Sequence, residues 1–210
     1  MRNAPTHARR PWTTLAITSL AVIAAVPAQA TEPAPADTAW SRSLTAAVSV
    51  PMQGGSFCGI VWGSLARTNG TTLTTGTIEG VRAGRHTCFD RLVIDVDQVP
   101  QSLTYDVRYV DTVRQEGSGR AVPLSGGAAL SIVVRAPASA DGAATYSPTD
   151  ATHLVGVTGW DTFRQVALAG SFEGQTTVGL GVRARLPFRV MVLDGPGDGA
   201  RLVVDVAHRW

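Results

Sequence analysis

The chain has 210 residues, of which 44% are hydrophobic and 16% are charged, a composition that excludes a disordered chain. Its formal net charge is +2, but three of its 18 basic residues, all arginines, lie in the first thirty positions. The remainder carries 15 arginines against 16 acidic residues, a net charge of about −1, so no nucleic-acid partner is expected.

The first thirty residues, Met1–Ala30, show the pattern of a secretory signal peptide. A positive segment with three arginines precedes the apolar segment Trp12–Val26 and the small-residue cleavage site Ala28-Gln29-Ala30. This apolar segment is shorter than the roughly 20 residues that span a bilayer, so a transmembrane anchor is the weaker alternative. The sequence after the arginine pair fits a twin-arginine signal poorly. We therefore expect Sec export, cleavage after Ala30, and a protein that is secreted or held in the cell envelope.

A short linker and a single domain are predicted after the cleavage site. The linker, Thr31–Ala39, is rich in proline, alanine and acidic residues. Residues 40–210 form the domain, in which apolar residues alternate with polar ones between turn-forming residues, a pattern that predicts strands. The segments with the clearest strand pattern are 44–50, 60–65, 78–82, 91–97, 103–110, 128–134, 166–172, 178–182, 188–192 and 201–206.

Little or no helix is expected in the mature chain, because no stretch of eleven or more residues has helical periodicity. Short strands between turn residues indicate an all-β protein, either an antiparallel sandwich or a barrel. The segment Pro137–Thr149 is long and made of small and polar residues, which predicts a loop that forms an insertion or a lid. Asp194–Gly199 predicts a hairpin turn.

Two of the predicted strands have nearly the same sequence. Arg91–Val96 and Arg201–Val206 differ at one position in six. If these strands are antiparallel neighbours, Arg91 faces Asp205 and Arg201 faces Asp95, and each such pair contributes a few tenths to about 1 kcal/mol. The alternative is that both segments are merely good strand sequences.

Cys58 and Cys88 are the only cysteines in the chain. An even pair in an exported protein indicates a disulfide, which would contribute about 3 to 4 kcal/mol in the chain-entropy model. A metal site that uses Cys58, His86 and Cys88 is the alternative, but no fourth ligand stands at a recognisable spacing. We therefore predict the disulfide, and neither a metal nor a cofactor.

Gly179 and Gly181 would leave a strip without side chains on one sheet face. Such a strip indicates close approach of another backbone, an aromatic ring or a ligand, and the aromatic candidates are Trp62, Trp160 and Trp210. An exposed ring beside such a strip could stack on a sugar, whereas a buried ring would be part of the core.

Several motifs occur in the order found in one known family. They are Gly84-Arg85-His86, Cys88–Val93, Gly117-Ser118-Gly119, Gly170–Gly174, Leu180-Gly181, Pro187–Val190 and Arg201–Val206. Between Gly76 and His208 the chain thus resembles the AMIN-like domain of small exported bacterial proteins. The resemblance implies a β-sandwich related to AMIN domains, which occur beside cell-wall amidases and secretin pores and are thought to bind peptidoglycan or other envelope components. Many relatives are lipoproteins, but no lipobox cysteine is present here, and no amidase domain is attached.

The candidate ligand-binding residues lie together at the start of the strand 91–97. They are Arg82, Arg85, His86, Asp90 and Arg91. Arginine offers a planar set of donors that suits carboxylates, which peptidoglycan stem peptides supply. The alternative is structural, with Asp90 paired to an arginine and His86 packed beside the disulfide.

Catalysis is not expected, because no motif of a serine hydrolase, a zinc protease or a phosphate-binding loop occurs. A hydrolase with a dispersed site would need His86 or His153 beside a serine and a carboxylate. Together with the signal peptide, the cysteine pair and the all-β pattern, the resemblance to AMIN-like domains implies a non-catalytic module that binds a cell-wall polymer, or alternatively a module that docks an envelope protein.

Overall fold

The computed structural model describes residues 56–99, 103–195 and 197–210. The predicted signal peptide, the linker and the strand 44–50 lie outside these residues. Fifteen β-strands and no helix occur in the described part, and every pairing between strands is antiparallel. The prediction of an all-β antiparallel sandwich is confirmed. No helix in this part of the chain is long and apolar enough to cross a membrane.

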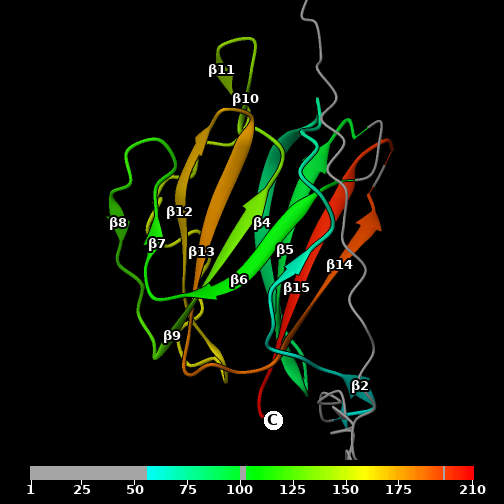
Figure 1. Cartoon of the computed structure of the whole chain (residues 1–210), viewed down its shortest axis with the longest axis vertical. Helices are drawn as coiled ribbons and strands as arrows, with labels where there is room; N and C mark the ends of the chain where they lie inside the picture. Colours follow the sequence, from blue (N-terminus) through cyan, green and yellow to red (C-terminus); the bar gives the residue numbers. More distant parts are fainter. Residues whose placement is uncertain (1–55, 100–102, 196) are drawn as a thin grey trace, which may run out of the picture. The chain divides into compact units, whose positions relative to one another are not determined.

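One sheet has five strands in the order β12-β13-β9-β6-β3 (Figure 1). Most of these strands are rich in β-branched, aliphatic and aromatic residues, which fit a pleated, half-buried surface. Their bounds are β3 Arg67–Thr68, β6 Tyr105–Val110, β9 Ala128–Val134, β12 Phe163–Phe172 and β13 Gln175–Val182.

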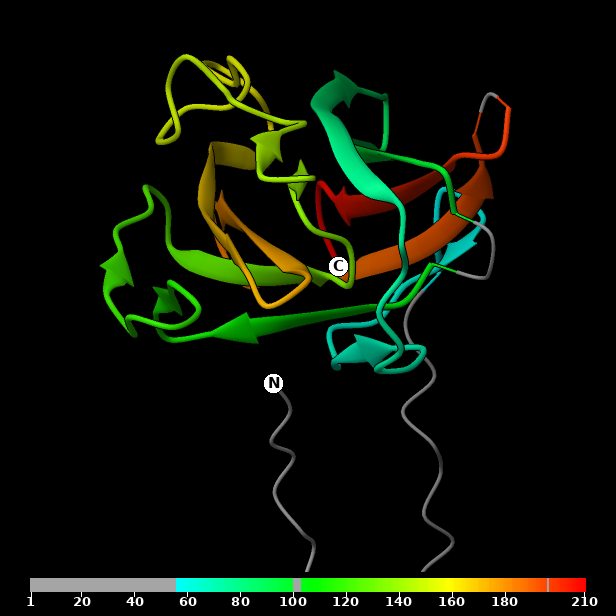
Figure 2. The same ribbon diagram turned by 90° about the horizontal axis from the view of Figure 1, so that it is seen from above.

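The second sheet has four strands in the order β14-β15-β5-β4, and Figure 2 shows both sheets from above. Its strands are β4 Thr77–Arg85, β5 Phe89–Asp97, β14 Phe188–Asp194 and β15 Ala200–Ala207. The two similar segments are therefore neighbours, with Arg91 opposite Asp205 and Arg201 opposite Asp95. Of the two alternatives, paired strands and a mere resemblance of strand sequences, the structure shows the paired strands.

Three small hairpins complete the described part. They are β1 Ser56–Phe57 with β2 Ile60–Val61, β7 Val113–Arg114 with β8 Ala121–Val122, and β10 Ser139–Ala140 with β11 Ala143–Ala144. The last of these lies within the predicted loop 137–149, which therefore holds a short hairpin. The predicted turn 194–199 joins β14 to β15.

The core lies between the two sheets. Each strand turns one set of alternate side chains inward, and the resulting cluster includes Leu92, Ile94, Leu130, Leu180 and Leu202, all fully buried. Burial of apolar surface stabilises the folded state by about 25 cal/mol per Å², so this cluster is the main source of stability.

The other face of the four-stranded sheet is also covered in part. Asp205 and Val203 point away from the core, yet they are 0% and 2% exposed. The covering segment begins at β1 and includes Trp62, which is 2% exposed and packs 5.9 Å from the Phe89 ring. A bridge between Gly63 and Phe188 fixes this segment to β14.

The disulfide between Cys58 and Cys88 holds the same segment, so the prediction of a disulfide is confirmed. Because both sulfur atoms are bonded to each other, a metal site made of Cys58, His86 and Cys88 is excluded.

Of the alternatives for the glycine strip, the structure shows close approach of another backbone, and the side chains nearest the strip are not those of a tryptophan. A Cβ at Gly179 would meet Leu124 and Val113, and one at Gly181 would fall on the Ser125 carbonyl oxygen. The connection after β8 therefore covers the strip. Its backbone approaches β13 more closely than any side chain at position 181 would allow.

Candidate functional site

The five predicted binding residues lie on the β4–β5 hairpin, but they face in different directions. Arg85 is opposite Asp90 in the strand register, and Gly84 is opposite Arg91. Because side chains alternate along a strand, Asp90 points inward whereas Arg91 points to the outer face. The predicted cluster therefore divides into two separate networks and an exposed remainder.

Asp90 belongs to the inner network and is fully buried. Its Oδ2 accepts hydrogen bonds from the backbone N–H groups of Thr162 at 2.7 Å and Phe163 at 3.0 Å. Its Oδ1 lies 3.2 Å from Nε2 of His208. A buried carboxylate that accepts several hydrogen bonds fixes the chain around it, here the start of β12.

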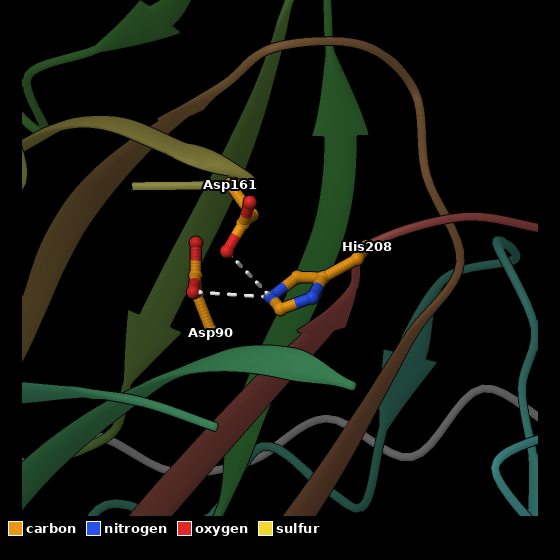
Figure 3. Close-up of side chains that lie close together, drawn as sticks. All are labelled: Asp90, Asp161 and His208. Atoms are coloured by element: carbon orange, nitrogen blue, oxygen red, sulfur yellow. Dashed lines mark hydrogen bonds and ion pairs between the residues drawn. The ribbon is translucent and has the colours of Figure 1, made fainter. Parts of the chain in front are cut away.

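Asp161 and His208 extend this network toward the surface (Figure 3). The His208 Nε2 atom lies 3.9 Å from Asp161 Oδ2, and Arg85 donates to the same oxygen at 3.3 Å. The network thus joins β4, β5, the loop before β12 and the residue after β15. Sequence reasoning missed Asp161 and His208 because neither stands in a motif; only the closure of the fold brings them to Asp90.

Asp90, Asp161 and His208 also place one ligand atom each within 4.8 Å of one another. The donor set does not fit a metal well, however. Asp90 Oδ2 already accepts two backbone hydrogen bonds, and a cation at Asp161 would compete with the Arg85 guanidinium. We therefore assign this network a structural role.

The outer network is centred on Asp205, which is fully buried. Arg91 donates to its two oxygens at 2.6 and 2.9 Å, and Arg189 donates at 2.8 Å from the opposite side. The three residues are in register across β14, β15 and β5. The hydrogen bond to Asp205 raises the pKa of Arg91 above its ordinary value, so this residue remains charged.

Aromatic rings surround the two arginines of this network. The Arg91 guanidinium lies 5.2 Å from the centre of the Phe89 ring, and that of Arg189 lies 5.3 Å from Phe89 and 5.4 Å from Trp62. His86 stacks on Phe89 with ring centres 4.5 Å apart. Such contacts each contribute about 0.5–2 kcal/mol, depending on exposure.

Arg82, Arg85 and His86 are the exposed members of the predicted cluster, and Arg85 also pairs with Asp161 of the inner network. Arg82 makes a two-point ion pair with Asp95 at 2.9 and 3.0 Å, which raises the pKa of Arg82. The side chains of Arg82 and Arg85 are 56% and 54% exposed, and His86 is exposed as well. Surface pairs of this kind contribute little to stability, so their donors can exchange partners at low cost.

Comparison with known families identifies the domain. A family model described as AMIN-like domain matches residues 76–208. The chain belongs to the AMIN-like domain family. No curated protein and no solved structure matches the chain. The matched AMIN-like region contains both networks and all the strands of both sheets except β3.

The segment before the AMIN-like region is tied to it covalently. Cys58 lies outside the match and Cys88 lies inside it. The disulfide, the Trp62 contact and the bridge at Gly63 therefore join residues 58–63 to the outer face of the AMIN-like region.

His86 and His153, the histidines that a dispersed hydrolase site would use, make contacts that differ from those of a catalytic triad. His153 Nδ1 lies 3.1 Å from Asp150 Oδ2 and 3.0 Å from Thr152 Oγ1. Hydrogen bonds, first of all from Thr152, lower the pKa of Asp150 to about 2. A catalytic triad needs the carboxylate and the nucleophile on different ring nitrogens, whereas here both lie at Nδ1. Neither His86 nor His153 is hydrogen-bonded to a serine in the described residues.

Proposed function

We propose that this AMIN-like protein is an exported, non-catalytic module of the cell envelope that binds a cell-wall polymer, with peptidoglycan as the expected ligand. The observation that carries the proposal is the family match over residues 76–208, which coincides with the antiparallel two-sheet fold. The Cys58–Cys88 disulfide supports export, because disulfides persist in oxidising compartments. The sequence pattern of Met1–Ala30 supports export as well.

The exposed residues Arg82, Arg85 and His86 form the proposed contact surface. Arg82 lies on the outer face of β4, opposite Val93, whereas Arg85 lies opposite Asp90 at the end of the strand. Both guanidinium groups offer donors to the carboxylates of stem peptides. Asp90 and Arg91 have a positioning role in this proposal. Asp90 fixes the end of the hairpin on the inner side of the sheet through its hydrogen bond from Thr162. Arg91 fixes it on the outer side through its ion pair with Asp205.

Co-sedimentation of the oxidised protein with purified sacculi at low salt tests the proposal. We expect retention that weakens as salt increases, because exposed ion pairs are screened. A variant with Arg82→Gln, Arg85→Gln and His86→Ala should be retained less than a control with Arg114→Gln and Arg120→Gln, two exposed arginines of the β7–β8 hairpin. Absence of retention by the native protein would refute wall binding.

Docking of an envelope protein is the second candidate function. Val61 and Leu65 favour it, because these apolar side chains are 76% and 77% exposed beside the buried Trp62. In that case the protein would be retained by untreated envelope material but not by protease-treated wall. Val61→Ser with Leu65→Ser would then abolish retention, whereas wall binding through Arg82 and Arg85 would be unaffected.

A further inference from the structure

An open cleft lies between the edges of the two sheets. Its volume is about 450 Å³, and it is lined by Ala66, Arg67, Thr68, Tyr105, Arg189 and Val190. Arg67 and Thr68 form β3, the end strand of the five-stranded sheet, and Arg189 and Val190 lie on β14, the end strand of the other sheet. This volume is within the range of roughly 300–1,000 Å³ that is typical of ligand sites.

Two of the six lining residues, Arg67 and Arg189, carry a positive charge. Among the described residues, Arg67 makes no hydrogen bond and no ion pair through its guanidinium group, which lies over Gly63, where an added Cβ would be 2.8 Å from Nη2. Arg189 binds Asp205 through Nε and Nη2 and keeps Nη1 available. Because Arg91 shares the same carboxylate, Asp205 neutralises only part of the local positive charge.

Tyr105 also lines the cleft and carries a phenol. Burial raises the pKa of Tyr105, and the nearby charge of Arg67 opposes this effect. The phenol is therefore protonated at neutral pH and lies close enough to Arg67 to feel its charge. Two guanidinium groups and a phenol are a donor set suited to an anion such as a carboxylate.

The cleft also borders an open strand edge. The Phe188 N–H group donates to the Gly63 carbonyl at 2.7 Å, so the backbone groups of Phe188 point away from β15. By the alternation of antiparallel strands, the backbone groups of Val190 and Val192 point the same way. In the described part of the chain no strand pairs with β14 on this side. Such an edge is a template for a further strand.

We propose that the cleft between β3 and β14 binds the C-terminal carboxylate of an extended peptide, which adds to the outer edge of β14. An antiparallel peptide would end beside Arg189, where β14 begins and the guanidinium groups lie. Backbone hydrogen bonds to Val190 and Val192 would hold its body, and Arg67, Arg189 and Tyr105 would hold its carboxylate. The proposal does not require wall binding by the exposed residues of the β4–β5 hairpin, and either can fail alone, although Arg189 of the cleft shares Asp205 with Arg91.

Titration of the oxidised protein with an N-acetylated tetra-alanine peptide tests this inference. The free acid should bind about tenfold or more tightly than the C-terminal amide, since only the acid forms charge-assisted hydrogen bonds. On binding, the amide signals of Val190 and Val192 should shift in two-dimensional NMR spectra and exchange more slowly with solvent. Equal affinity of acid and amide, absence of binding, or binding without an effect at Val190 and Val192 would overturn the proposal.

Variants test whether the preference for the free acid depends on residues of the cleft. Arg67→Gln should remove the preference for the acid, and Tyr105→Phe should reduce it. Arg114→Gln, an exposed arginine on β7, should leave it unchanged. If Arg67→Gln retains the full preference while its thermal melting temperature is native, the carboxylate is not bound here and the assignment is wrong.

Peptide chirality distinguishes the two sources of such a carboxylate. Peptides that end in D-Ala-D-Ala represent wall stem peptides, and peptides that end in L-Ala-L-Ala represent protein C-termini. Tighter binding of the D-terminated acid identifies the wall as the source, and tighter binding of the L-terminated acid identifies a protein. Either preference supports the cleft as a carboxylate site, provided that it disappears in Arg67→Gln.

Discussion

Arg91 and Asp205 lie directly opposite each other on β5 and β15, and the Arg91 guanidinium binds both carboxylate oxygens at 2.6 and 2.9 Å. The two residues are 114 positions apart in the sequence, and they belong to nearly identical six-residue segments. Their pairing gives the repeated sequence a physical role, because each copy places an arginine opposite an aspartate of the other. Only one of the two possible side-chain pairs forms, since Asp95 binds Arg82 and Arg201 binds the Asp194 carbonyl.

Replacement of Asp205 should be one of the most destabilising single changes on the outer face. Asp205→Ala leaves Arg91 and Arg189 without their shared partner in a covered site, and we expect a loss of about 3–5 kcal/mol in the free energy of unfolding. Asp95→Ala is the matched control, because it breaks an exposed pair worth about 1 kcal/mol or less. Urea unfolding of the two variants gives the comparison. Similar losses would show that Asp205 is not a buried ionic centre.

The sequence predicts the strands of this fold better than it predicts their surroundings. The alternation in 91–97 and 201–206 identifies the inner faces correctly, with Leu92, Ile94 and Leu202 buried. It does not reveal that Asp205 is buried, because the cover comes from the distant segment around Trp62. Periodicity reports which face a residue is on, whereas the packing on that face depends on how remote segments cross it.

For the same reason, the candidate site could be predicted from the sequence only in part. Arg82, Arg85 and Arg91 are close in sequence, but alternation along β4 and β5 and the cross-strand partners divide them between separate ion pairs. Asp161 and His208 join Asp90 only through loop closure. Arg67 and Arg189 lie 122 positions apart by residue number and line one cleft only because the ends of two sheets meet.

Reduction of the disulfide should destabilise the protein substantially. Cys58 and Cys88 close a loop with a sequence separation of 30, so loss of the bond should cost about 3 to 4 kcal/mol in the chain-entropy model. Unfolding of the Cys58→Ser, Cys88→Ser double variant measures this loss without added reductant. We also expect fluorescence of Trp62 to shift toward that of an exposed indole, because the disulfide fixes the covering segment. An unchanged unfolding midpoint would contradict this role.

Gly181 is expected to tolerate no side chain. An added Cβ would fall on the backbone oxygen of Ser125, and β13 is a central strand that cannot move away from both of its neighbours. Gly181→Ala should therefore cost about 1–3 kcal/mol or more. Gly156→Ala is the control, because nothing lies within 4 Å of a Cβ there, and its effect should stay within about 0.5 kcal/mol. Thermal melting of both variants tests the difference.

Stability should fall at alkaline pH because of Tyr109. Burial raises the pKa of Tyr109 from 10.0 to about 12. Because the folded state favours the protonated phenol, its contribution is fully present below pH 10 and is lost as the pH rises toward 12. Urea unfolding between pH 9 and pH 12 should show this decline, and Tyr109→Phe should flatten it. The variant also loses hydrogen bonds to both Leu186 backbone groups, so its stability at pH 7 should be about 1–3 kcal/mol lower.

Asp90 should be required for stability because its carboxylate accepts two buried backbone hydrogen bonds. Asp90→Ala leaves the buried N–H groups of Thr162 and Phe163 without a partner, and we expect a loss of about 3 kcal/mol. Asp90→Asn keeps one carbonyl oxygen that can accept both bonds, so it should cost clearly less. Hydrogen exchange at Thr162 and Phe163 separates the two cases: both amides should exchange rapidly in the alanine variant and remain protected in the asparagine variant. If the asparagine variant is as unstable as the alanine variant, the negative charge facing His208, rather than the acceptor geometry, holds this end of the sandwich together.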